Sequence, residues 1–191
     1  QGPEIMEFIE TSCDICGSGK STVLFSKEGF VHVRCDVCGL VYVNPRLIDH
    51  LDGQIYSGTA EMGGESFTSS QVKRLTSELR RLEIYRNTNQ ILEIGPGKGW
   101  FLEQAMKLGW EVWAVEVNIK ALSRLQQMGI RHVIASSADS FRVPEGHFDV
   151  IRMWDVIEHL PSPMRALSLS HRALRSGGLI RISTTNFASL S

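Results

Sequence analysis

Three glycines at alternate positions end an apolar run near the middle of the chain, and this stretch constrains the fold more than any other. Gly95, Gly97 and Gly99 directly follow the run from Ile91 to Ile94, which is typical of a buried parallel strand. Glycine permits positive φ angles and lets a ligand approach the main chain. Because an apolar helical pattern comes next, the stretch predicts a nucleotide-type binding corner.

The spacing of these glycines argues against a dinucleotide. The run reads G-x-G-x-G, whereas the dinucleotide fingerprint is G-x-G-x-x-G, and Trp100 stands where its third glycine would be. Glu116 ends the next apolar run, at a distance that suits an acid binding ribose hydroxyls. A structural turn and a solvated strand-end glutamate are the alternatives.

With Glu93 two residues before the first glycine, the pattern E-x-G-x-G-x-G resembles motif I of class I S-adenosylmethionine (SAM)-dependent methyltransferases. Residues 147–161, with FDVI and then DVIEHL, resemble the fourth strand and following loop of that family. Residues 174–186 resemble its glycine turn, fifth strand and Thr-x-Asn exit. The similarity is greatest to the branch that includes quinone-biosynthesis O-methyltransferases and many bacterial small-molecule and sugar-tailoring enzymes.

The resemblance implies an α/β fold with the Rossmann-like sheet of class I methyltransferases and a small N-terminal zinc ribbon. Alternating patterns predict parallel strands joined by helices. The strands are expected over 90–94, 111–116, 131–135, 147–153 and 178–184, and the helices over 70–85, 99–108, 119–128 and 162–174. The family's sheet has seven strands, so we expect the C-terminal strands to be missing from this chain.

The resemblance also implies a set of cofactor-binding residues. By this resemblance, Glu93 is expected to bind the amino group of SAM and Glu116 to bind the ribose. The loop after the third strand contacts adenine, although relatives usually place an Asp where this chain has Ser137. Trp154 lines the cofactor region or belongs to the core. The full set is Glu93, Gly95, Gly97, Gly99, Glu116, Ser137, Ala138, Asp139 and Trp154.

Asp155, Glu158 and His159 would share one face if their segment were helical. His159 is then a candidate general base for a substrate hydroxyl, with Asp155 as a second catalytic candidate. Two alternatives stay open: Glu158 and His159 cap the loop, or the three residues hold a divalent cation.

All four cysteines lie before residue 39, as two C-x-x-C pairs separated by 18 residues. This spacing is typical of a zinc ribbon, in which two tight turns complete a closed, structural S4 site. Disulfides are the alternative, but a chain without an export signal is expected in a reducing, cytoplasmic compartment. The predicted Zn²⁺ ligands are Cys13, Cys16, Cys35 and Cys38.

We expect three parts along the chain: the zinc ribbon over 5–46, a linker or lid with Tyr56 over 47–70, and a SAM-binding domain over 71–191 that is incomplete at its C-terminus. Gln1 and Gly2 look like a tag remnant or a processed end. The helix over 70–85 has an apolar stripe, and its other face carries an excess of three positive charges. That face is either solvated or contacts a phosphate or lipid headgroup. Its charged residues are Lys73, Arg74, Glu78, Arg80, Arg81, Glu83 and Arg86.

The resemblance implies transfer of a methyl group from SAM to a small molecule, such as a sugar or another secondary or cell-surface metabolite. The formal net charge of −1 gives no general attraction to nucleic acid, and no apolar run is long enough to span a membrane. An RNA methyltransferase with a substrate-binding ribbon is one alternative, but residues 1–46 carry four basic against six acidic side chains. A non-catalytic SAM-binding module is the other. Nothing in the sequence indicates an oligomeric state.

Overall fold

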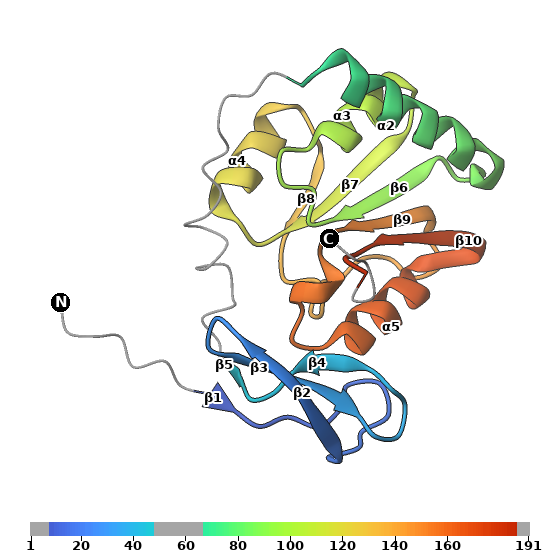
Figure 1. The fold of residues 1–191 in the computed structure, drawn as a ribbon. Coiled ribbons are helices and arrows are strands. Elements are labelled where there is room, and N and C mark those ends of the chain that lie inside the picture. The colour runs from blue at the N-terminus through green and yellow to red at the C-terminus, as the bar shows by residue number, and fades with distance from the viewer. Residues whose placement is uncertain (1–7, 48–66, 187–191) are drawn as a thin grey trace. The chain divides into compact units, whose positions relative to one another are not determined.

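The computed structural model describes residues 8–47 and 67–186, which form two compact units (Figure 1). Most of the expected linker, including Tyr56, and the ends of the chain lie outside the described residues. Among the helices that the structure describes, none has the length and apolar character needed to cross a membrane.

The N-terminal unit is a small set of antiparallel strands. A two-residue turn joins β2 to β3, with Glu28 and Gly29 at φ angles of 53° and 84°, as hairpin twist requires. Within residues 8–47, its core holds only Cys13, Val33, Cys35 and Tyr42 as buried residues. The three-stranded sheet consists of β2 Ser21–Lys27, β3 Phe30–Cys35 and β4 Val41–Val43, and β1 Phe8–Ile9 pairs with β5 Arg46–Leu47.

The second unit contains a parallel five-stranded sheet in the order β10-β9-β6-β7-β8 (Figure 1). The expected α/β fold with a parallel central sheet is therefore confirmed. The strand order reverses between β6 and β9, and such a switch point opens a crevice at the carboxyl ends of the strands. The strands are β6 Gln90–Ile94, β7 Glu111–Glu116, β8 His132–Ala135, β9 Phe148–Trp154 and β10 Leu174–Ser183.

Helices cover both faces of this sheet. Apolar residues of α2, α3 and α4 share one core cluster with the strands, and those of α5 belong to the cluster on the other face. Because successive strand residues point to opposite faces, Ile91 packs under α2 and α3 while Leu92 faces the opposite side. The helices are α2 Ser69–Leu82, α3 Trp100–Lys107, α4 Ile119–Gln127 and α5 Pro163–Ala173, with single 3₁₀ turns η1 Glu83–Tyr85 and η2 Ile157–His159.

The last strand differs from the sequence prediction. β10 begins at Leu174, directly after α5, whereas a loop was expected up to residue 177. Leu174 already pairs with Phe148 in parallel register, and the irregularity between Leu174 and Leu179 contains Gly177 at a φ of 76°. The glycine turn is thus an interruption within the strand. The helix expected over 70–85 likewise ends at Leu82 and continues as η1.

Asp149, near the start of β9, links the residues that precede β6 to the start of β10. Its buried carboxylate accepts hydrogen bonds from the backbone N–H groups of Asn87, Thr88 and Asn89 at 2.8–3.1 Å. Arg175 Nε lies 2.5 Å from Asp149 Oδ1. Burial raises the pKa of this carboxyl, but the Arg175 guanidinium and the three N–H donors outweigh burial and lower the pKa to about 2.

We expect Asp149→Asn to lower the free energy of unfolding by about 2 kcal/mol at pH 7, because the native state favours the charged carboxylate. This contribution is fully present above the unfolded-state pKa near 3.8 and is lost as the pH falls through about 2. Urea unfolding of both proteins between pH 2 and 7 measures the difference. Glu145→Gln is the control, because Glu145 pairs with Arg172 on the exposed surface. A difference that stays constant across this range would contradict the assignment.

Candidate functional site

The glycine turn lies at the carboxyl ends of the central strands, beside the switch point. Gly95 N donates to Val115 O at 2.8 Å, which ties the start of the turn to β7. Gly99, with a φ of 74°, precedes the first residue of α3. The strand, turn and helix therefore follow one another in the order that the sequence predicts.

The three glycines of the turn differ in what a side chain at each position would contact. A Cβ on Gly95 would lie 2.5 Å from Val156 Cγ2, and one on Gly99 would lie 2.7 Å from Leu125 Cδ2. At both positions, neighbouring side chains of the protein already fill the space that a Cβ would need. A Cβ on Gly97 would have no atom within 4 Å. Only Gly97 of the three therefore faces open space, where a ligand can approach the main chain.

Glu116 faces the same turn from the end of β7. Its Oε2 accepts a hydrogen bond from Gly97 N at 3.1 Å, and its Oε1 accepts from Val117 N and Asn118 N at 2.8 and 2.9 Å. The side chain of Asn118 in turn caps α4. The acid and the open glycine, which the sequence analysis placed in one site, are thus in direct contact.

Glu93 is buried and pairs with Arg152, the residue opposite it on β9. Arg152 Nη1 donates to Glu93 Oε1, while Glu93 Oε2 is buried without a hydrogen-bond partner in the part of the chain that the structure describes. Burial raises the pKa of the Glu93 carboxyl to about 7, although the Arg152 guanidinium opposes the shift. An oxygen left in this state has the capacity to accept a hydrogen bond from a ligand.

Two further charged residues complete this buried cluster. Glu78 Oε1 accepts from Arg152 Nε at 2.9 Å and from Arg181 Nε at 2.7 Å. Glu78 was expected on the charged outer face of its helix, and that expectation was wrong: only 9% of it is exposed. Arg152 was not among the residues predicted from the sequence. The sequence does contain an indication of its role: Arg152 interrupts the apolar run Phe148–Trp154, and a charge buried in a strand needs a partner.

The three residues predicted to contact adenine lie in one loop after β8. Ser137 Oγ donates to Asp139 Oδ1 at 2.6 Å and lies 2.6 Å from Ser140 Oγ. Ala138 is buried in the core cluster on the α5 face. The serine therefore orients the aspartate within the loop, and contact of these residues with a ligand stays a prediction.

The segment after β9 does not gather its polar residues on one helical face. Asp155 has a φ of 52° and donates its N–H to Ser183 O at 3.0 Å, so it stands outside the single turn η2. Asp155, Glu158 and His159 are all exposed. Trp154, predicted for the cofactor region, is partly buried at the end of β9. The catalytic roles of Asp155 and His159 stay predictions.

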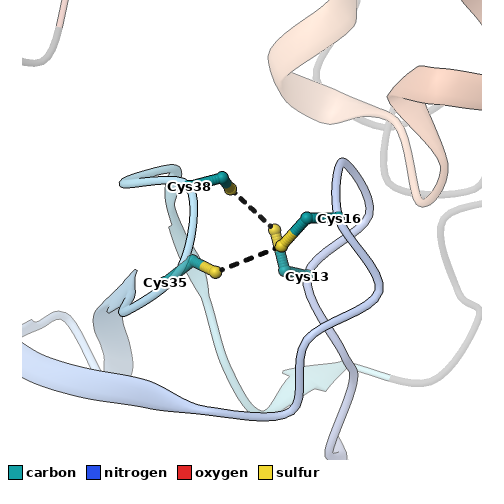
Figure 2. A group of neighbouring side chains, drawn as sticks. All are labelled: Cys13, Cys16, Cys35 and Cys38. Carbon is teal, nitrogen blue, oxygen red and sulfur yellow. Dashed lines mark hydrogen bonds between the residues drawn. The ribbon is translucent and has the colours of Figure 1, made fainter.

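The four cysteines meet in one cluster in the N-terminal unit (Figure 2). Their sulfur atoms all lie within 4.8 Å of one another, and no other group of three or more His, Cys, Asp or Glu ligands does so within residues 8–47 and 67–186. All four thiols are free. Tetrahedral zinc with bonds of about 2.3 Å would hold sulfur atoms about 3.8 Å apart. The closest pairs here are Cys13 to Cys38 at 3.4 Å and Cys16 to Cys35 at 3.5 Å.

The two cysteine turns repeat the same backbone pattern. Gly17 N donates to Cys13 O at 2.8 Å and Gly39 N to Cys35 O at 3.0 Å, and both glycines have positive φ angles. Backbone N–H groups of Cys38 and Val37 donate to the Cys35 sulfur and lower the pKa of its thiol to about 6. Because the thiolate is the form that binds metal, the lowered pKa favours Cys35 as a metal ligand.

Comparison with known proteins gives matches along most of the second unit. A family model described as a methyltransferase domain matches residues 66–190. The ubiquinone biosynthesis O-methyltransferase of Aromatoleum aromaticum is 30% identical over 134 residues, which cover 62% of this chain and 56% of that protein. The chain spans about half the length of the curated relatives it matches, from 42% to 56% of them.

Solved structures share the fold at low sequence identity. The plantazolicin methyltransferase BpumL, in complex with SAH, aligns with a TM-score of 0.51 and 20% identity over 60% of this chain and 48% of that one. The [4+2]-cyclase SpnF aligns with a TM-score of 0.50 and 18% identity over 62% and 47%. Since proteins of different activity share this fold, the activity has to be argued from the site.

Proposed function

Because the chain belongs to the methyltransferase domain family, we propose that it transfers a methyl group from SAM to a small molecule. The observation that carries this proposal is the corner at the end of β6. There Gly97 faces open space, Glu116 binds the same turn, and Glu93 keeps one buried oxygen that has no partner among the described residues.

The residues at this corner fit the cofactor. When bound, SAM supplies an electrophilic methyl group on a positively charged sulfur. Glu93 Oε2 would accept a hydrogen bond from the ammonium group, and the Glu116 carboxylate would accept from ribose hydroxyls. The open side of Gly97 would admit the ligand to the main chain. The two carboxylates also suit a cationic ligand, because opposite charges attract strongly in a partly buried site.

The acceptor is proposed from the relatives and from the segment after β9. The curated relatives are named as ubiquinone biosynthesis O-methyltransferases, which supports a hydroxyl oxygen as the acceptor atom. A sugar or another secondary metabolite is compatible with this. Asp155 and His159 follow β9 at the carboxyl edge of the sheet, and His159 is the proposed base for the hydroxyl proton. Methyl transfer is an in-line displacement, so positioning of the two reactants supplies most of the acceleration.

We further propose that residues 5–46 form a zinc ribbon and that residues 71–191 belong to the methyltransferase domain. The four converging thiols and the repeated turns support a structural Zn²⁺ ion. With only four buried core residues between positions 8 and 47, the N-terminal unit has little apolar burial to offset chain entropy. Metal binding would supply that stability.

We expect Glu116→Ala to weaken binding of S-adenosylhomocysteine (SAH) by about tenfold or more, because hydrogen bonds to a charged group are lost. Gly97→Ala should also weaken binding, since the added methyl group enters space that the protein leaves open. Isothermal titration measures both affinities. The control is Glu103→Ala, whose carboxylate pairs with Lys107 on the surface of α3. Wild-type affinity in both test variants would refute the cofactor assignment.

We expect mass spectrometry under native conditions to find about one zinc ion per chain, the stoichiometry of a single S4 site. Cys35→Ser should lower the zinc content, and a chelator should remove the dispersion of NMR signals from the N-terminal unit. Ser26→Ala, a matched change on β2, should have no effect. A metal-free chain with an intact N-terminal unit, or one with disulfides between these cysteines, would contradict the zinc proposal.

A further inference from the structure

Three guanidinium groups surround the indole of Trp154 at the carboxyl end of β9. The Cζ atoms of Arg152, Arg74 and Arg181 lie 4.5, 5.7 and 5.8 Å from the ring centroid, within the range of cation–π attraction. They come from three elements, α2, β9 and β10. Like charges gathered around one ring repel one another unless anions neutralise them.

The carboxylates of the buried cluster neutralise only two of these three charges. Glu93 and Glu78 both pair with Arg152, and Glu78 also pairs with Arg181. The Arg181 side chain is nevertheless 42% exposed. Arg74 is exposed on α2 and pairs with no carboxylate among the described residues. One positive charge is therefore left over, on the solvent side of the cluster.

The arginines around Trp154 lie at the same edge of the sheet as the cofactor corner. Phe67, two residues before the start of α2, stacks on Trp100, directly after the glycine turn, with ring centroids 4.7 Å apart. The start of α2 is therefore beside the turn. Arg74, in the second turn of α2, reaches Trp154 where β9 ends. The two sites differ in charge, because the corner presents the carboxylate of Glu116, whereas the arginines around Trp154 keep one positive charge.

We propose that Arg74, Trp154 and Arg181, here called the basic aromatic surface, bind an acidic group of the methyl acceptor, a carboxylate or a phosphate. The inference rests on the proposed methyltransferase function and specifies its substrate class. Guanidinium groups match carboxylate and phosphate oxygens with paired hydrogen bonds. The positive charge at the basic aromatic surface would repel the cationic groups of the cofactor, so each reactant would be held by the charge opposite to its own.

The acidic group bound by the basic aromatic surface has two candidate sources, the methyl acceptor and the cofactor, because the cofactor itself carries a carboxylate. The two sources differ in what saturation with SAH does. If an acceptor group binds here, the basic aromatic surface stays available when SAH fills the corner. If the cofactor carboxylate binds here, SAH occupies it. An anion titrated into the SAH complex therefore separates the two.

The experiment is a titration of the full 191-residue chain, saturated with SAH, with phenyl phosphate at low salt. The indole N–H signal of Trp154, identified by its loss in Trp154→Phe, is followed by NMR. We expect a saturable shift of this signal, and no shift with uncharged phenol. Arg74→Gln should weaken phenyl phosphate binding by about tenfold through loss of a charge-assisted contact, and Arg181→Gln should act in the same direction. Arg80→Gln, an exposed arginine of α2, is the matched control.

Each other result overturns the inference. It fails if phenyl phosphate gives no saturable shift, or if Arg74→Gln and Arg80→Gln behave alike. It also fails if SAH displaces phenyl phosphate and Arg74→Gln weakens SAH binding equally, because the arginines then hold the cofactor carboxylate. Absent SAH binding in the wild type would contradict the proposed function and the inference with it. SAH binding without phenyl phosphate binding would contradict the inference alone.

Discussion

Burial of Glu93 opposite Arg152 in the two central strands is the constraint on which the rest of the second unit depends. A buried ion pair needs additional partners, because desolvation of two charges costs more than one contact returns. Glu78 of α2 supplies one such partner, and the face of Phe101 lies 4.3 Å from the Arg152 guanidinium. The pair therefore fixes α2 and α3 against the sheet as well as joining β6 to β9.

The same pair links the fold to the proposed chemistry. Arg152 binds only one oxygen of Glu93. The other is buried two residues before the glycine turn and has no partner within residues 8–47 and 67–186. A fully satisfied carboxylate would be more stable but would have nothing to offer a ligand. Strain and unsatisfied groups are expected at functional sites, where the surrounding structure compensates for them. Here the compensation comes from the remainder of the ionic cluster.

Local patterns predicted the parts of the fold that depend on neighbouring residues. The glycine run, the acid at Glu116 and the alternation of strands and helices each correspond to a feature of the structure. Local patterns could not predict the contacts of Arg152, since its partners Glu93 and Glu78 lie 59 and 74 positions away in the chain. The expectation for Glu78 failed for a different reason. Glu78 follows Leu75 by three residues and precedes Leu82 by four, so helical periodicity places it on the buried stripe, and only its charge had assigned it to the outer face. Asp155 shows a further limit, because its left-handed backbone is set by its bond to Ser183 on the next strand.

The role of the Glu93–Arg152 pair is tested by the affinity for SAH as a function of pH, in the wild type and in Glu93→Gln. The pKa of Glu93 is raised to about 7, so a ligand ammonium group that needs the carboxylate should bind more tightly as the pH rises from 6 to 8, with release of a proton. Glu93→Gln should bind about tenfold more weakly at pH 8 through loss of the charged acceptor, and its affinity should not follow that pH dependence. Equal affinities and parallel pH profiles for the two proteins would contradict the central role given to the Glu93–Arg152 pair.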